Sequence, residues 1–109
     1  MMTPAFAHPV ERELARIFDE LEIPWEYEPT TFVLERNADG SVAEAFTPDF
    51  YLPEQDMYVE VTTMQQRLTS KKNRKLRKLR EQGVLVTVLY RRDFERLRKR
   101  HGFPFEIAA

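Results

Sequence analysis

The stretch that decides the fold is Ala45-Phe-Thr-Pro-Asp-Phe-Tyr-Leu-Pro-Glu-Gln-Asp-Met-Tyr-Val-Glu-Val-Thr62. Residues 45–52 and 57–62 are rich in the aromatic and β-branched residues that favour strands. Residues 53–56, Pro-Glu-Gln-Asp, have the composition of a turn. Because so short a connection joins neighbouring antiparallel strands, we expect the two segments to pair as a hairpin.

Two carboxylates, Asp49 and Glu60, lie inside these predicted strands, where a solvated acid is out of place. On paired strands their side chains can converge on one point. Oxygen ligands placed in this way suit a hard cation, Mg²⁺ or Mn²⁺. The alternative is that both residues are surface acids on edge strands, and their spacing alone leaves both interpretations open.

A helix is predicted ahead of this hairpin. Its apolar residues recur at spacings of three and four positions and form one stripe, which contains Val10, Leu14, Ile17, Phe18 and Leu21. Ile23-Pro24 ends the pattern. Glu11 lies three residues before Leu14, so it borders the stripe and is the helix acid best placed to face inward. Alternatively, it is an ordinary boundary residue of an amphipathic helix.

Two segments with the composition of strands lie between this helix and the hairpin. Residues 25–29 and 30–34 are both rich in strand formers. Asn37-Ala-Asp39-Gly40 follows them as a turn signal between strands. Together with the hairpin, these segments are expected to form two or three antiparallel strands after the first helix.

The rest of the chain is predicted to be helix, strand and helix. Residues 65–82 form a long basic helical pattern that Gly83 ends. Residues 84–90 are a continuous apolar run, which is typical of a buried parallel strand. Asp93 then caps a second basic helix over residues 94–100.

Composition limits the classes of protein that this chain can belong to. With 109 residues, 42% hydrophobic and 32% charged, it is expected to form one globular domain. It has no cysteine, which excludes disulfide frameworks, thiolate zinc sites and cysteine nucleophiles. No apolar run approaches the roughly 20 residues of a membrane span, and the first residues lack the pattern of a secretory signal. We therefore expect a cytoplasmic protein without a membrane partner.

The net charge of −1 conceals a strong asymmetry. Residues 1–60 hold 14 acids and 3 bases, whereas residues 61–109 hold 4 acids and 14 bases. Such a division favours an anionic partner, with nucleic acid as one candidate. It is equally consistent with two halves that neutralise each other within one fold.

Several of these residues together resemble the PD-(D/E)XK nuclease superfamily. The resemblance covers roughly residues 8–90 and is carried by Thr47-Pro48-Asp49, Tyr58-Val-Glu60-Val, the helical Glu11 and Trp25-Glu-Tyr27-Glu28-Pro29. It implies a single α/β domain over residues 1–109, with a restriction-endonuclease-like mixed central sheet flanked by helices in the order α-β-β-β-α-β-α. It also implies that Asp49 and Glu60 ligate Mg²⁺ or Mn²⁺, that Glu11 completes the acidic cluster, and that water then hydrolyses a phosphodiester.

The sequence departs from the family pattern at one position. The lysine expected two residues after Glu60 is replaced by Thr62, which supplies no positive charge for the reacting phosphate. Lys72 offers a replacement, because it lies four residues after Leu68 and four before Leu76, within the apolar stripe of the predicted helix. The resemblance permits a catalytic lysine on this helix. The alternative is a lysine that snorkels from the edge of the core.

Three more polar residues are candidates for supporting roles at the same site. Gln65 shares the side of the predicted helix that carries Lys72. Thr62 occupies the position of the missing lysine, and Glu28 follows the first predicted strand. The sequence leaves open whether Glu28 belongs to the site or only to the fold.

The basic helix pattern itself indicates a nucleic-acid surface. Residues 67–80 hold eight bases and no acid, and like charges four positions apart repel each other on an isolated helix. Phosphates facing the helix would explain why the bases are retained. The residues expected to contact nucleic acid are Arg67, Lys71, Arg74, Lys75 and Lys78. The alternative is a solvated face that the acidic half of the chain balances.

The predicted function is a metal-dependent endonuclease in which Glu11, Asp49, Glu60 and Lys72 are catalytic. DNA is favoured over RNA as the partner. Because the chain has no room for a separate domain that reads sequence, single-stranded, mismatched or structured DNA is favoured over a specific duplex sequence. A homodimer acting on a duplex is plausible. The alternative function is an inactive nucleic-acid-binding or regulatory module on the same fold.

Overall fold

The computed structural model describes residues 5–62 and 70–99 and shows a small α/β domain. Its elements follow in the order α1 (Pro9–Glu20), β1 (Glu26–Tyr27), β2 (Phe32–Arg36), β3 (Val42–Phe46), β4 (Phe50–Leu52), β5 (Met57–Thr62), α2 (Ser70–Glu81), β6 (Val86–Tyr90), a 3₁₀ turn (Arg91–Asp93) and α3 (Phe94–Lys99). Among these helices, none has both the length and the apolar composition needed to cross a membrane.

The central sheet is mixed, with the strand order β1-β4-β5-β6. β4 and β5 pair antiparallel, with Phe50 opposite Val59, which confirms the predicted hairpin. β5 and β6 pair parallel, with Glu60 opposite Val88, which confirms the parallel strand expected from the apolar run. Helix α2 makes the crossover between these two parallel strands, as such a connection requires.

The prediction of one continuous strand over residues 45–52 is wrong. β3 ends at Phe46 and β4 begins at Phe50, and the two strands belong to different sheets. Pro48 lies in the break, where it has no backbone N–H to donate to a sheet ladder. Asp49 therefore lies directly before β4 rather than inside a strand. Within the described residues five strands precede α2, so the predicted order with three strands there is also wrong.

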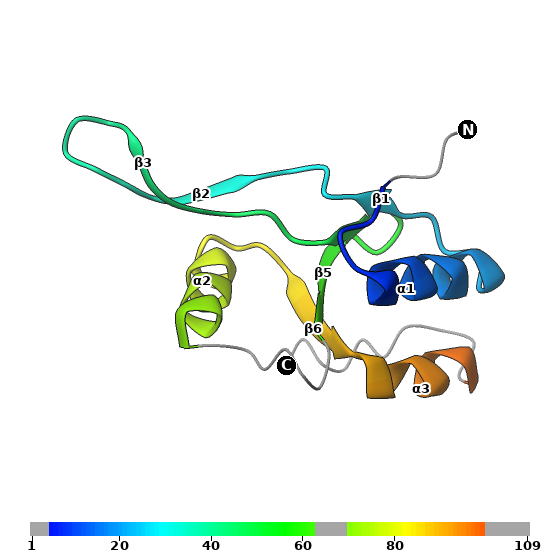
Figure 1. Ribbon diagram of the computed structural model, residues 1–109. Helices are drawn as coiled ribbons and strands as arrows, with labels where there is room; N and C mark the ends of the chain where they lie inside the picture. The colour runs from blue at the N-terminus through cyan, green and yellow to red at the C-terminus, as the bar shows by residue number, and fades with distance from the viewer. Residues whose placement is uncertain (1–4, 63–69, 100–109) are drawn as a thin grey trace.

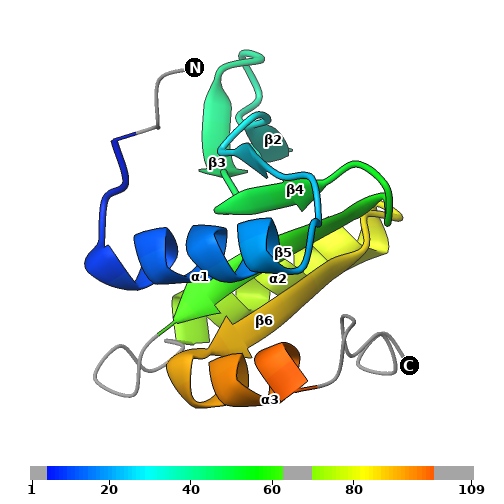
Figure 2. The same ribbon diagram turned by 90° about the vertical axis from the view of Figure 1, so that its right-hand side faces the viewer.

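Helices cover both faces of the central sheet (Figure 2). On one face, α1 and α3 pack on the sheet around a core whose fully buried side chains include Leu14, Phe18, Phe50, Val59 and Leu97. On the other face, α2 contributes Leu76 and Leu79, which pack with Val86 and with partly buried side chains of β2 and β3. Side chains alternate along β5, so Met57, Val59 and Val61 face the first core and Tyr58 faces the second.

Local signals explain the ends of the helices. Pro9 occupies the first turn of α1, where its missing N–H costs nothing. The helix ends at Glu20, and Glu22 then takes a left-handed backbone conformation. Gly83, with φ of 86°, follows α2 and permits the same kind of reversal. The first five residues of the predicted helix 65–82 include Gln65, Arg67 and Leu68 and lie outside the described residues.

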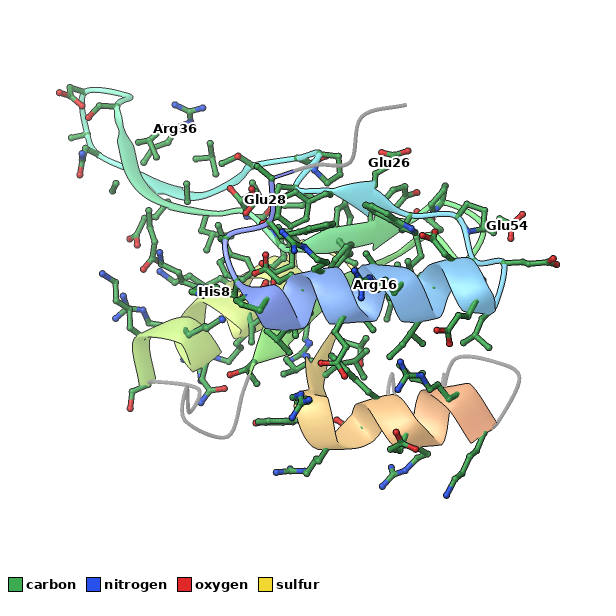
Figure 3. The ribbon with its side chains drawn as sticks, turned by 45° about the vertical axis from the view of Figure 1, so that its right-hand side comes forward. His8, Arg16, Glu26, Glu28, Arg36 and Glu54 are labelled. Atoms are coloured by element: carbon green, nitrogen blue, oxygen red, sulfur yellow. The ribbon has the colours of Figure 1, made fainter. Side chains whose placement is uncertain are left out.

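The β2–β3 hairpin forms an arm, residues 32–46, that projects from the rest of the domain (Figure 1). The predicted turn at Asn37–Gly40 is confirmed, since the Gly40 N–H donates to the Asn37 carbonyl at 2.9 Å. Arg36 lies out on this arm, away from the end of α1 that carries His8 (Figure 3). The root of the arm packs on α2 through Phe32 and Phe46.

Leu79→Ala tests the second core. Leu79 is fully buried, so its truncation is expected to lower the free energy of unfolding by about 2–5 kcal/mol in urea denaturation. Val42→Ala on the exposed arm, where the side chain is 51% exposed, is the control and is expected to change it by less than about 0.5 kcal/mol. Equal effects of the two substitutions would contradict the packing described here.

Candidate active site

Asp49 and Glu60 meet beside the start of β4, as the hairpin prediction required. The Asp49 backbone N–H donates to Glu60 Oε1 at 3.2 Å, and the Val61 N–H donates to Asp49 Oδ2 at 2.8 Å. These two bonds hold the Glu60 carboxylate against the backbone just before β4 and the Asp49 carboxylate against the backbone of β5. Asp49 is 8% exposed and Glu60 is 5% exposed, so the interpretation of both as surface acids is wrong.

Lys72 reaches this carboxylate pair from the first turn of α2. Its Nζ lies 2.5 Å from Glu60 Oε2, and its side chain is 30% exposed. Because side chains alternate along a strand, Glu60 shares the α2 face of the sheet with Tyr58 and Thr62. The structure thus places the lysine of the helix next to the second acid, while Thr62 is buried two residues farther along β5.

Burial and mutual repulsion raise the pKa values of both carboxyl groups. Desolvation is the largest cause for Asp49, followed by the negative charge of Glu60, and together they raise its pKa from 3.8 to about 8. The pKa of Glu60 is also raised, mainly by burial, although the hydrogen bond and charge of Lys72 act against the rise. The positive charge of Lys72 therefore does not fully offset the effect of burial on the pKa values of the two acids.

Glu11 is held beside this pair by a tyrosine. It is 4% exposed, and its charge contributes to the raised pKa of Asp49. The Tyr27 hydroxyl donates to Glu11 Oε1 at 2.6 Å and accepts the Ala7 N–H at 3.1 Å. Glu11 therefore faces inward as predicted. The part of Tyr27 in positioning it was missed, because a hydrogen bond between residues 16 positions apart leaves no periodic signal.

Glu28 lies at the edge of the same region. Its backbone N–H donates to the Asp49 carbonyl at 2.8 Å, which ties the end of β1 to the start of β4. It has a left-handed φ of 47°, which is uncommon for a residue with a side chain. The Glu28 side chain is exposed and lies above the start of α1 in Figure 3. Its contribution to the site is therefore the backbone hydrogen bond to Asp49. Gln65, the other predicted supporting residue on the helix side, lies outside the described residues.

Much of the positive charge of α2 is directed at the arm. Glu44 of β3 accepts Arg74 at 2.8 Å and Lys78 at 2.9 Å, and Lys78 also pairs with Glu35 at 2.8 Å. These two bases lower the pKa of Glu44 to about 2. Lys75 donates to the Ala45 carbonyl at 3.1 Å.

The predicted nucleic-acid contacts of α2 thus differ in their surroundings. Arg74 and Lys78 share the carboxylates of the arm, although the Arg74 side chain is still 49% exposed. Lys71 is exposed in the first turn of α2, next to Lys72. Arg67 lies outside the described residues. Among the predicted contacts that the structure describes, Lys71 is the nearest in sequence to Glu60. Its side chain is exposed to solvent.

The donor set fits a hard divalent cation. Asp49 and Glu60 offer carboxylate oxygens side by side, and burial, the largest cause, raises the pKa values of both, so a cation that stabilised their ionised forms would be favoured there. Among the described residues, no three histidine, cysteine or carboxylate side chains are gathered as one metal-binding group. Glu11, engaged by Tyr27, is thus near the pair but not joined to it.

Comparison of the chain with protein-family models, with curated proteins and with solved structures finds no match. The functional assignment therefore depends on the contacts of Asp49, Glu60 and Lys72.

The pH dependence of stability tests the burial of Asp49. In EDTA the folded protein keeps a proton on Asp49 that the unfolded chain loses near its ordinary pKa of 3.8. The free energy of unfolding is therefore expected to fall as the pH rises from about 4 towards the folded pKa of about 8, by up to about 1.4 kcal/mol per pH unit for one proton.

Urea denaturation across this pH range measures the effect. Asp49→Asn is expected to make the slope shallower, whereas Glu54→Gln, which removes an exposed acid from the turn before β5, should leave it unchanged. Identical slopes for the wild-type protein and Asp49→Asn would show that Asp49 is ionised in the folded state.

Proposed function

We propose that this protein is a metal-dependent phosphodiesterase that cleaves nucleic acid, with DNA favoured as the substrate. The observation that carries the proposal is the buried pair of Asp49 and Glu60 with Lys72 Nζ 2.5 Å from Glu60. Paired carboxylates next to a fixed ammonium are the groups that phosphodiester hydrolysis needs for a cation, for charge stabilisation and for positioning.

Asp49 and Glu60 are the proposed ligands of Mg²⁺ or Mn²⁺. When bound, such a cation polarises the phosphodiester and favours ionisation of the attacking water. The two residues are presented by backbone bonds from Asp49 and Val61, so their oxygens are oriented before any ion arrives. Glu11 adds negative charge from α1, with Tyr27 fixing its orientation.

Lys72 is proposed to supply the positive charge that Thr62 cannot. In hydrolysis a bond forms between a water oxygen and phosphorus, and the bond from phosphorus to the leaving ester oxygen breaks. Negative charge grows on the phosphoryl oxygens meanwhile, and an ammonium held in place stabilises it without having to move. Lys72 is held by Glu60, so its position is set before the substrate binds.

The topology supports a restriction-endonuclease-like core as part of this proposal. β4 and β5 form the antiparallel pair that carries the acids, and β6 lies parallel to β5 after the α2 crossover. This arrangement agrees with the mixed sheet that the sequence resemblance implies. The exposed basic side chains of α2, Lys71 among them, suit a phosphate backbone rather than a defined base sequence.

A second candidate is an inactive nucleic-acid-binding module, and Thr62 is the observation that favours it. This residue is buried at the position where the family pattern has a lysine. If the Lys72 ammonium only neutralises Glu60, the site binds without turning over. Salt-sensitive binding with no cleavage in any metal would select this candidate.

Cleavage assays test the proposed activity. We expect cleavage of single-stranded or mismatched DNA with Mg²⁺ or Mn²⁺ and none in EDTA. Asp49→Asn, Glu60→Gln and Lys72→Met are each expected to lower the rate by at least about 100-fold, because each removes a group that acts on the reacting phosphate.

Matched controls separate chemistry from charge. Glu54→Gln removes an exposed acid and Lys99→Met removes an exposed base of α3, and both variants are expected to keep the wild-type rate. The proposal fails if no DNA or RNA substrate is cleaved in either metal, or if Asp49→Asn retains full activity.

A further inference from the structure

A stacked pair of side chains lies where β6 ends. The guanidinium carbon of Arg92 is 4.3 Å from the centre of the Tyr90 ring, within the range of a cation–π interaction. Arg92 is exposed and Tyr90 is half-buried. Asp93 Oδ2 accepts the Tyr90 backbone N–H at 2.8 Å, which fixes the turn that carries Arg92. Arg92 is therefore held against Tyr90 on an exposed turn.

This stack lies on the same side of the sheet as the carboxylate pair. Tyr90 is opposite Thr62 and Val88 is opposite Glu60 in the parallel ladder. Alternation places Glu60 and Thr62 on one face of β5, and the residues opposite them in β6 share that face. Tyr90 is thus about 7 Å farther along the strands than Glu60. It is the last residue of β6, whose carboxyl end lies beside that of β5 (Figure 2).

Two neighbouring bases, Arg91 and Arg98, are paired with carboxylates, and Arg92 is not. Arg91 pairs with Glu13 of α1 at 3.0 Å, and Arg98 pairs with Glu20 at 3.4 Å. Within residues 5–62 and 70–99, no ion pair involves Arg92. Its charge is instead held over the Tyr90 ring, a contact that leaves the N–H groups of the exposed guanidinium free of any carboxylate within the described residues.

We propose that Arg92, oriented by Tyr90, binds a backbone phosphate of the nucleic acid next to the one at the carboxylate pair. The substrate class in this proposal rests on the proposed function. A guanidinium held in place by a ring binds phosphate oxygens at a smaller entropic cost than a free side chain. The contact reads no base, so it is the same for DNA and RNA and independent of sequence.

Equilibrium binding in EDTA tests this contact without any cleavage. Fluorescence anisotropy is measured with labelled single-stranded DNA and RNA oligonucleotides over about 50–200 mM salt. Arg92→Gln is expected to weaken binding about tenfold on both. It is also expected to reduce the slope of log K against log salt by about 0.7, the contribution of one phosphate contact on a single strand.

Two further variants give the controls. Arg98→Gln removes an equal charge from α3 and is expected to change affinity by less than about twofold, because Arg98 is paired with Glu20. Tyr90→Leu keeps the charge of Arg92 but removes the ring, so affinity is expected to fall several-fold with the salt slope nearly unchanged. Tyr90→Phe retains the ring and is expected to bind as the wild type does.

The outcomes separate this inference from the proposed activity. Binding that depends on Arg92 in a protein that cleaves nothing supports the phosphate contact and rejects the nuclease. Cleavage with wild-type affinity in Arg92→Gln rejects the contact and leaves the nuclease standing. Equal losses in Arg92→Gln and Arg98→Gln, a loss on DNA or RNA alone, or no binding by the wild type would each overturn the inference.

Discussion

The constraint on which the structure depends is the burial of two carboxylates side by side. Asp49 and Glu60 are removed from water at the junction of β4, β5 and α2, where an ionised acid is costly unless it is paired. Two backbone N–H groups and Lys72 compensate part of that cost. The pKa of Asp49 nevertheless remains high. A fold that retains such a pair is short of positive charge at one point, and a divalent cation is the simplest group that would supply it.

Charges between α2 and the arm are also paired with opposite charges. Arg74 and Lys78 are drawn towards Glu44, so the acidic first half and the basic second half of the chain do neutralise each other along the arm. The neutralisation is local, however. Lys71, in the first turn of α2, and Arg92, directly after β6, are exposed and have no carboxylate partner within the described residues. The interpretation of two halves that neutralise each other is therefore confirmed along the arm, whereas the anionic partner stays a prediction.

Local patterns predicted most of the elements but not their grouping. The spacing of Leu14 and Phe18, the apolar run that ends at Tyr90 and the turn before Met57 all report on nearest neighbours, and these elements are confirmed. The split of the strand at Pro48 depends on which sheet each half joins, a tertiary choice that a run of strand formers does not encode. Inward placement of Lys72 and Glu11 followed from helical periodicity. Their partners came from elsewhere in the chain, as the bond from Tyr27 to Glu11 illustrates.

The most direct test of the central claim is the calorimetric titration of Mn²⁺ into the protein near pH 7, in two buffers of different ionisation enthalpy. Because Asp49 is protonated there in the ion-free protein, binding is expected to release about one proton per ion, so that the measured enthalpy depends on the buffer. Asp49→Asn is expected to bind far more weakly and without that proton. Undetectable binding by the wild type at millimolar Mn²⁺, or equal buffer-independent binding by both proteins, would contradict the account.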